Sequence, residues 1–448
     1  MGVIMHVVVL GAGITGLTAA WTLVKHLKGR VRVTLIEKSN RVGGWIRTDR
    51  VDGFLFERGP RSVRASGQGG AALKLIEEIG LKDEVLFSSP EAKKRYVWHE
   101  GRLECAPSSL WQAFRSPLTK DLVGGFLREG LRKKGSLQDE SIYDFIARRY
   151  SAELAERLIA PLTACIYAGD IRCLSIRACF PFLKEWEEEH GSILGGAFKQ
   201  IFKRRSATPR GLISLKQGME SLPKALMNRL DSVVLFQREA VRIYNHGSSI
   251  VVELSNGQHI EADHLICTLP AEGVSKLLDL PQMAVPSASV AVVNVGYNSQ
   301  VLNNKGFGCV FPARARTPVL GVVWDSSAFP EQNSHPDQTR LTLMMGGSYD
   351  PAIIEQTDET LAKTALEELK LHLGVDTPPA ALSVFRAKHA IPSYPVGHCE
   401  RVEETRGYLK KTYPKLSVIG TAWEGVAVGA CIAQGDRIGQ SIVEFAKK

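Results

Sequence analysis

A glycine turn between a short apolar strand and a helix is the feature that most constrains the fold of this chain. Residues 6–20 read HVVVLGAGITGLTAA, in which Gly11, Gly13 and Gly16 have the spacing G-x-G-x-x-G. The first glycine allows a tight turn, the second lets a pyrophosphate approach the backbone, and the third lets the helix pack closely on the strand. The backbone N–H groups of residues 12–15 open that helix, where its positive dipole end favours phosphate.

A second strand completes a βαβ unit. Residues 31–37 read VRVTLIE, and Glu37 ends this strand, where an acidic side chain accepts a hydrogen bond from a ribose 2′-OH. Strand, glycines, helix, strand and terminal acid together predict a dinucleotide site in an α/β domain.

The next turn, KSNRVGGWIRT, contains Arg41, Gly44 and Trp45. An R-x-G-G turn at this point resembles flavoproteins related to monoamine oxidase, and the resemblance implies FAD rather than NAD.

Length and composition favour a soluble protein with two or three substructures. The chain has 448 residues, of which 44% are hydrophobic and 23% charged. No apolar run approaches the roughly 20 residues that cross a bilayer, and the first strand begins too early for a targeting peptide. The eight cysteines form no C-x-x-C pair, which predicts reduced thiols and no metal site. The net charge of +9 suits acidic small molecules or an anionic surface, but basic and aromatic residues do not alternate as in nucleic-acid platforms.

The chain is expected to alternate between a nucleotide-binding domain and two insertions. An Asn256-Gly257 turn marks a hairpin, and the C-terminus reads as a strand, a glycine turn and a long helix. We expect a discontinuous FAD-binding domain over 1–60, 206–270 and 393–448, a substrate-binding domain over 61–105 and 271–392, and a helical insertion over 106–205. The fold class is therefore α/β (α+β), with a Rossmann-like domain of the monoamine or polyamine oxidase type.

The helical insertion places large apolar residues beside basic ones. Trp, Phe and Leu next to a basic face are typical of an interfacial membrane helix, and ordinary packing within the domain is the alternative. The apolar residues are Trp111, Phe114, Leu118, Leu122 and Phe126, and the basic ones are Arg115, Lys120, Arg128, Arg132, Lys133 and Lys134, with a second basic cluster at 203–205.

Motifs along the whole chain resemble the oxygen-dependent protoporphyrinogen oxidase family, of the type found in mitochondria and many bacteria. They read ERGPRSVR, IYAGDIRCLSIRACFP, GFGCVFP, VLGVVWDSSAFPEQ, RLTLMMGGSY, IPSYPVGH and GTAWEGVAV. The resemblance implies three two-electron oxidations of protoporphyrinogen IX to protoporphyrin IX by non-covalent FAD, with O₂ as acceptor and H₂O₂ as product. Flavin N5 accepts the hydride, so no catalytic side chain is expected.

The resemblance also assigns residues to both ligands. Arg61 of the G-P-R motif is expected to pair with a substrate propionate, because an arginine fork suits a carboxylate, and Arg95 matches a second arginine near the pocket. The other substrate positions, which taken alone read as ordinary strand or turn residues, are Gly169, Phe307, Gly308, Val310, Val323 and Met344. The FAD positions are Gly11, Ala12, Gly13, Ile14, Thr15, Gly16, Glu37, Lys38, Arg41, Gly44, Trp45, Gly59, Pro60, Arg61, Ala240 (or its neighbour Val241), Thr421, Gly425, Val426, Ala427 and Val428.

Alternatives remain open at this point. Oxidation of coproporphyrinogen III to coproporphyrin III is the same chemistry on a substrate with four carboxylates. An amine oxidase would need an aromatic cage or a flavin-facing lysine near Met344, and Rab-escort and GDP-dissociation-inhibitor proteins reuse this fold without catalysis. The resemblance further implies a membrane-facing insertion, a homodimer, and a place in the cytoplasm, on the inner membrane of a bacterium, or on the mitochondrial inner membrane.

Overall fold

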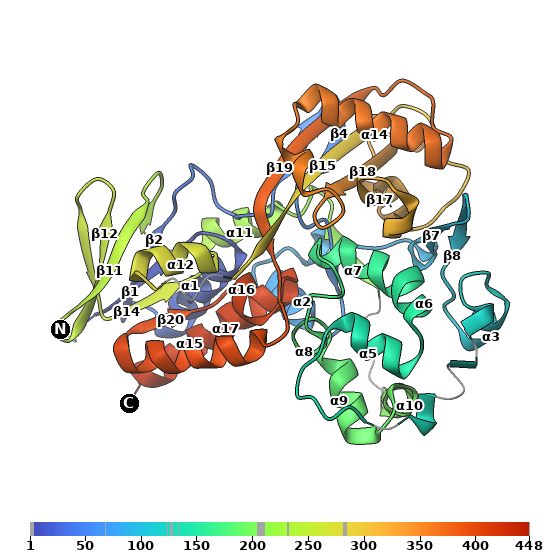
Figure 1. The fold of residues 1–448 in the computed structure, drawn as a ribbon. Helices are drawn as coiled ribbons and strands as arrows, with labels where there is room; N and C mark the ends of the chain where they lie inside the picture. The colour runs from blue at the N-terminus through green and yellow to red at the C-terminus, as the bar shows by residue number, and fades with distance from the viewer. Residues whose placement is uncertain are drawn as a thin grey trace.

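Three groups of elements make up the molecule. The computed structural model describes residues 4–67, 69–122, 124–125, 129–132, 134–203, 211–230, 233–280 and 285–447. A sheet flanked by helices lies near both termini, a larger sheet lies above and to its right, and a cluster of helices lies at the lower right (Figure 1). This mixed architecture confirms the expected fold class, with a helix-flanked parallel sheet as its first unit.

The first unit is built on a five-stranded parallel sheet with the strand order β10-β2-β1-β14-β20. These strands are β1 (Met5–Leu10), β2 (Val31–Ile36), β10 (Val233–Leu235), β14 (His264–Cys267) and β20 (Leu416–Val418). Strand β1 lies at the centre and its residues 7–10 are at most 1% exposed, because helices and loops cover both faces of a parallel sheet. Three distant stretches of the chain therefore supply one sheet.

Helices α1 (Ile14–Leu27) and α17 (Val428–Ala446) pack against each other beside this sheet. Small residues bring them close: a Cβ on Gly435 would lie 2.4 Å from the carbonyl oxygen of Thr15. Helix α11 (Ser221–Arg229) also packs on α1.

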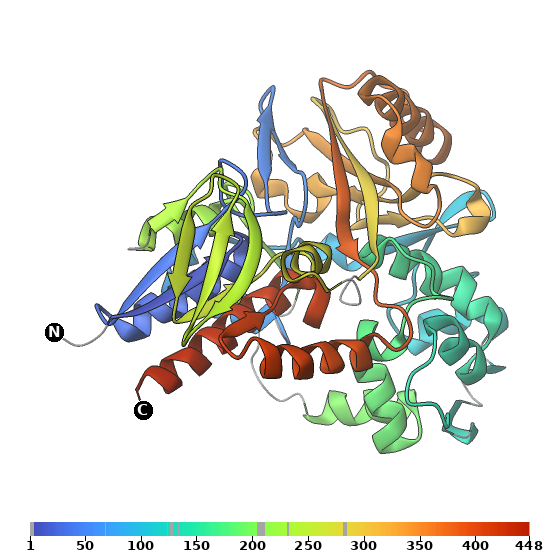
Figure 2. The same ribbon diagram turned by 60° about the vertical axis from the view of Figure 1, so that its left-hand side comes forward.

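A three-stranded antiparallel sheet consists of β11 (Ala240–His246), β12 (Ser249–Leu254) and β13 (His259–Ala262), and Figure 2 brings it forward. It contains the expected hairpin at Asn256-Gly257.

The second unit is a seven-stranded sheet with the order β19-β15-β18-β17-β16-β7-β8, antiparallel except between β16 and β7. Its strands are β7 (Arg95–His99), β8 (Arg102–Cys105), β15 (Ser287–Tyr297), β16 (Gly308–Val310), β17 (Val319–Trp324), β18 (Thr339–Gly346) and β19 (Ala381–Pro392). Along β15, Ala291, Val293 and Val295 pack in the core that includes helix α14 (Asp358–Leu373). Val290 and Val292 alternate with them and point to the opposite face, which lines a cavity described below.

The third unit is the helical insertion. Its α-helices are α3 (Leu110–Arg115), α5 (Ile142–Arg149), α6 (Ala152–Leu154), α7 (Ala160–Tyr167), α8 (Ile176–Cys179), α9 (Pro181–His190) and α10 (Ile193–Lys203). Serines 141, 151 and 175 cap the N-termini of α5, α6 and α8 by accepting backbone N–H bonds. Among the described helices, none combines the length and the apolar character needed to cross a bilayer.

Residues 61–105 divide between two units, which differs from the expected substrate-binding assignment. Helix α2 (Gly69–Glu78) buries Ala72, Leu75 and Ile76 in the core that holds α1 and α17. Strands β5 (Val63–Arg64) and β6 (Val85–Phe87) pair with β9 (Leu212–Leu215), whereas β7 and β8 join the seven-stranded sheet. An apolar helix face shows only that it is buried, so the sequence could not identify its packing partner.

The smaller elements complete the connections between these units. Strands β3 (Thr48–Val51) and β4 (Phe54–Glu57) form a hairpin that leads into the G-P-R loop. The other α-helices of the described residues are α12 (Ala271–Leu278), α13 (Asp325–Ala328), α15 (His398–Thr412) and α16 (Thr421–Glu424).

Candidate active site

The glycine turn after β1 leaves no room for a side chain at Gly11 or Gly16. Gly11 has φ +95°, and a Cβ there would lie 2.6 Å from the hydroxyl of Thr268. A Cβ on Gly16 would lie 2.1 Å from the carbonyl oxygen of Gly11. These contacts are the close turn and the close helix–strand approach that the G-x-G-x-x-G spacing predicts. The turn leaves the start of α1 facing a cavity.

Glu37 follows the last residue of β2 and holds the glycine turn in place. Its Oε2 accepts a hydrogen bond from the backbone N–H of Ala12 at 2.9 Å, and its Oε1 accepts from the N–H and hydroxyl of Ser39 at 2.8 and 2.9 Å. Oε1 thus uses both of its lone pairs, whereas Oε2 keeps one, and Glu37 lines the same cavity as the glycines. Its geometry fits an acceptor for a ribose hydroxyl.

The R-V-G-G turn packs directly against the glycine turn. The N–H of Gly43 donates to the carbonyl of Ala12 at 2.8 Å, and Gly13 and Gly43 form an isolated β-bridge. The guanidinium of Arg41 donates to the carbonyls of Val42 and Ile46 at 2.9 and 3.2 Å. Arg41 therefore braces this turn from behind, and its side chain is not part of the cavity wall.

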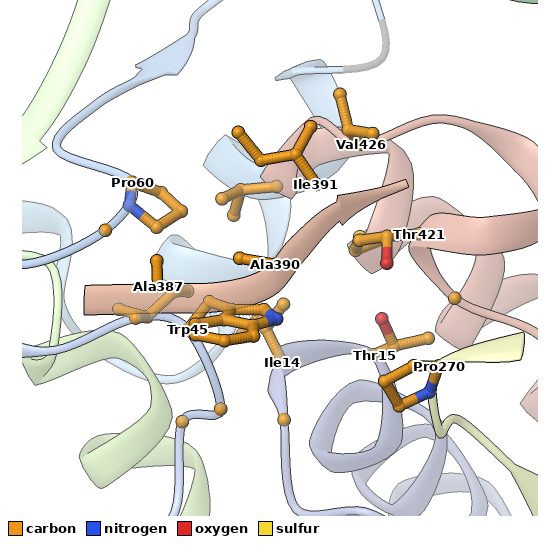
Figure 3. Close-up of a pocket in the computed structure, with 18 of the residues that line it drawn as sticks. Ile14, Thr15, Trp45, Pro60, Pro270, Ala387, Ala390, Ile391, Thr421 and Val426 are labelled. Carbon is orange, nitrogen blue, oxygen red and sulfur yellow. The ribbon is translucent and has the colours of Figure 1, made fainter. Parts of the chain in front are cut away.

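The turn before α17 closes the cavity from the other side. The four-residue helix α16 lies between Gly420 and Gly425, with φ values of +125° and +105°. Gly420 donates its N–H to Oε1 of Gln434 on α17 at 2.9 Å. Thr421 and Val426 line the cavity opposite the glycine turn, as the close-up shows (Figure 3).

These turns enclose a cavity of about 450 Å³ between the five-stranded and the seven-stranded sheets. Its remaining wall is apolar and includes Val290, Val292, Met344 and Ala387 from the larger sheet. The expected site residues that line it are Gly11, Gly13, Ile14, Thr15, Glu37, Gly44, Trp45, Gly59, Pro60, Arg61, Met344, Thr421, Val426 and Val428. A phosphate cradle, a ribose acceptor and an apolar slot in this order fit a dinucleotide with a flat ring.

Arg61 is, with Arg58, one of two arginines among the described residues of the cavity wall, and it is already paired. Its Nη1 donates to both carboxylate oxygens of Asp325, at 3.0 and 3.4 Å, and the two side chains are 12% and 11% exposed. Thr342 also donates to Asp325 at 2.7 Å. Within the described part of the chain, Nη2 and Nε of Arg61 have no protein partner, so these donors are available to a ligand.

The match to a family model decides what the cavity holds. The family described as flavin-containing amine oxidoreductase matches residues 14–443. The chain belongs to this family. Its cofactor is FAD, and it is an FAD-dependent oxidase, so the escort-type alternative does not apply. When bound, FAD supplies a two-electron acceptor that the side chains of this oxidoreductase do not provide.

Curated relatives match this oxidoreductase over nearly its whole length. The bovine protoporphyrinogen oxidase is 36% identical, with 96% of each chain covered, and the human one is 35% identical, with 98% of each covered. The coproporphyrinogen III oxidase of Bacillus subtilis is 29% identical, with 96% of each covered.

Solved structures share the fold. A protein of Exiguobacterium, provisionally named protoporphyrinogen oxidase, superposes with a TM-score of 0.85 at 26% identity, with 98% of this chain and 99% of that chain covered. A redesigned putrescine oxidase superposes with a TM-score of 0.73 at 17% identity, with 98% and 99% covered, which shows the fold alone.

Several expected site residues of this oxidoreductase lie outside the cavity wall. Ala12 and Gly16 shape the glycine turn from behind, whereas Lys38 pairs with Glu239 on the surface at 2.7 Å, next to Ala240. Gly425 and Ala427 line a second cavity on the far side of the C-terminal turn. None of these residues is part of the wall of the first cavity.

The expected substrate residues at the far edge of the seven-stranded sheet are also outside the 450 Å³ cavity. The guanidinium of Arg95 lies over the ring of Phe307 at 5.6 Å, and Gly308 pairs with Val323 across β16 and β17. Val310, on the same strand as Gly308, and Gly169, where an added Cβ would lie 3.1 Å from Leu174, do not line the cavity either. Strand order explains the difference, because β17 and β18 separate β16 from β15.

Sequence reasoning missed about half of the cavity wall. One missed group follows β14, where Thr268, Leu269 and Pro270 stand at the carboxyl end of a parallel strand. That position is where such sheets bind ligands, so the strand pattern could have identified them. The other missed residues are Gly43, Ile46, Arg58, Ile166, Val290, Val292, Ala387, Ala390, Ile391, Pro392, Gly420 and Cys431. Among the described residues, no three His, Cys, Asp or Glu side chains gather as a metal site would require.

Proposed function

We propose that this flavin-dependent oxidase converts protoporphyrinogen IX to protoporphyrin IX in tetrapyrrole biosynthesis. Removal of six electrons and six protons by three O₂ molecules gives three H₂O₂. The observation that carries this proposal is the sequence identity of 35–36% to the human and bovine protoporphyrinogen oxidases over 96–98% of the chain. It agrees with the motifs that extend from the first strand to the last helix.

The chain's own part in this reaction is to bind, orient and exclude water. The wall formed by Val290, Val292 and Met344 offers apolar surface for a macrocycle and keeps the cavity dry on the side of the larger sheet. Arg61 is the proposed partner of one propionate, because Asp325 accepts from its Nη1 while Nη2 and Nε have no hydrogen-bond partner among the described residues. A fixed guanidinium fork orients a carboxylate better than a mobile cation does.

Coproporphyrinogen III is the second candidate substrate, favoured by the similarity to the B. subtilis enzyme over 96% of both chains. Anaerobic mixing of the holoenzyme with each porphyrinogen, with flavin bleaching near 450 nm as the readout, distinguishes the two. Protoporphyrinogen IX is expected to reduce the flavin faster. Faster reduction by coproporphyrinogen III would reverse the assignment, and no reduction by either would refute both.

We also propose that the helical insertion contacts a membrane surface. Trp111 and Phe114 on α3 are 65% and 47% exposed, and Leu131 is 86% exposed. Arg115 lies over the ring of Trp111 at 4.4 Å, so apolar and cationic groups share this surface. Leu118 is fully buried and is not part of it, and Phe126, Arg128, Lys133 and the side chains of the cluster at 203–205 lie outside the described residues.

Co-sedimentation with vesicles tests this contact. A Trp111→Ser, Phe114→Ser double variant is expected to lose binding to anionic vesicles, because an exposed aromatic pair supplies most of the insertion energy. Phe445→Ser is the matched control, since Phe445 is 67% exposed on the C-terminal helix. Equal binding by both variants would contradict the proposal. A bacterial cytoplasmic or inner-membrane location, a mitochondrial inner-membrane location and a homodimer stay predictions of the family resemblance.

A further inference from the structure

The segment from 393 to 398 joins the helical insertion to the rest of the molecule. It follows β19, whose last residues line the cavity. The carbonyl of Tyr394 accepts a hydrogen bond from the N–H of Ser175 at 2.8 Å, and the N–H of Gly397 donates to Oδ2 of Asp139 at 2.9 Å. Both partners belong to the insertion, so the backbone of this segment is fixed to it.

The side chain of Tyr394 reaches in the opposite direction, to the C-terminal turn. Its hydroxyl donates to the carbonyl of Thr421 and accepts from the N–H of Gly425 at 3.0 Å. These two backbone groups belong to the first residue of α16 and the residue that follows it. Tyr394 is 1% exposed, and the ring of His398 stacks on it at 4.4 Å, with 19° between the planes. One hydroxyl therefore closes the short helix at both ends.

Helix α16 depends on such external bonds. It has only four residues between Gly420 and Gly425, both in backbone conformations that end regular structure. Gln434 of α17 holds the N–H of Gly420. Tyr394 is the corresponding support at the other end, next to Val426, which lines the flavin cavity. Movement of this hydroxyl would change the shape of the cavity wall.

We propose that Tyr394 is a positioning residue that holds the C-terminal turn against the flavin and connects this turn to the helical insertion. The proposal rests on the placement of FAD in the cavity described above. It does not depend on which porphyrinogen is the substrate. A displacement of the insertion would reach the flavin through the backbone of Tyr394 and its hydroxyl.

The test compares two buried tyrosines that each lose only a hydroxyl. Tyr167 is the matched control: its ring centroid lies 5.8 Å from that of Tyr394, and its hydroxyl donates to the carbonyl of Cys179 at 3.0 Å, within the insertion. Tyr394→Phe is expected to weaken FAD binding about tenfold, because two backbone groups of the turn lose their partner. It is also expected to shift the visible flavin spectrum and the midpoint potential in a dithionite titration. Tyr167→Phe is expected to keep wild-type values.

Two outcomes would overturn the proposal. One is wild-type FAD affinity and spectrum in Tyr394→Phe, and the other is an equal loss in both variants, which would indicate general packing. If Tyr394→Phe yields little folded protein, excess FAD is expected to restore the yield, since a ligand stabilises the folded state to which it binds. A loss that excess FAD does not restore would also overturn the proposal. Dithionite needs no porphyrinogen, so an error in the proposed substrate would leave these results unchanged.

Discussion

The carboxyl of Glu57 makes stability depend on pH in a way that can be tested directly. Glu57 ends β4, immediately before the loop that carries Arg61, and it is 5% exposed. Its Oε1 accepts from the N–H of Met219 at 2.7 Å and its Oε2 from the hydroxyl of Thr48 at 2.9 Å. Burial raises its pKa to about 7, although these hydrogen bonds and the nearby Arg61 oppose the shift.

The sign and the size of the effect follow from this pKa. Below the unfolded value of 4.5 the carboxyl of Glu57 is protonated in both states, so its stabilising contribution is fully present. As the pH rises to about 7, the unfolded chain ionises while the folded protein does not, and the contribution is lost. At about 1.4 kcal/mol per pKa unit, the loss is about 3 kcal/mol at pH 8.

A Glu57→Gln variant isolates this effect. Its amide oxygen can still accept from Met219 and its NH₂ can donate to Thr48, but it cannot ionise. With about 2.1 cal/mol/K of unfolding entropy per residue, the 448-residue chain loses about 1 °C in melting temperature per kcal/mol. The variant is therefore expected to melt about 3 °C above the wild type at pH 8, with a much smaller difference at pH 5.

The assay is thermal unfolding of the two holoenzymes, followed by flavin fluorescence from pH 5 to pH 8. Glu77→Gln is the control, because Glu77 is an exposed carboxyl paired with Lys82. It is expected to follow the wild type at every pH. A Glu57→Gln variant that melts at or below the wild type at pH 8, or that differs equally at pH 5 and pH 8, would refute the reasoning.

Three further predictions concern the cofactor, the substrate and acid stability. Gly16→Ala is expected to purify without FAD, because its Cβ would lie 2.1 Å from the carbonyl oxygen of Gly11, whereas Gly70→Ala, at an open position, is expected to keep wild-type flavin absorbance. Arg61→Lys is expected to raise the porphyrinogen KM about tenfold without changing flavin reduction by dithionite, since a lysine lacks the fork; an unchanged KM would contradict its role. Burial lowers the pKa of His398 to about 4, so the wild type is expected to lose stability as the pH falls from 6.5 towards 4. His398→Phe, which cannot be protonated, is expected to show a smaller loss between pH 7 and pH 5 in thermal melts, and an equal loss would count against this cause.

Short sequence motifs predicted the parts of the site whose geometry depends on residues that are adjacent in the chain. The glycine turn could be recognised from sequence because Gly11 has a left-handed backbone conformation that favours glycine and Gly16 lies where a Cβ would meet the carbonyl oxygen of Gly11. The Asn256-Gly257 hairpin and the apolar strand before the glycine turn could also be recognised, from a turn dipeptide and from a run of β-branched residues. The full-length motif resemblance then supplied the cofactor and the family.

Contacts between distant segments could not be predicted in this way. Arg61 was expected to face the substrate, but the sequence contains no sign that Asp325, 264 residues later, takes one of its donors. Arg41 was expected among the FAD-binding residues, and its guanidinium donates to the carbonyls of Val42 and Ile46 in its own turn. A charged side chain binds whichever partner the fold brings within reach, and that partner is decided by packing.

The sequence by itself predicted a dinucleotide site at a glycine turn with Glu37 as the ribose acceptor, and its motifs predicted the flavin oxidase family to which the chain belongs. Tertiary structure decided which side chains face the cavity. Alternation along β15 directs Val290 and Val292 towards it, and the strand order leaves Val310 and Val323 outside its wall. The reason is physical: a motif fixes local backbone geometry, whereas the wall of a cavity is set by how separate elements pack.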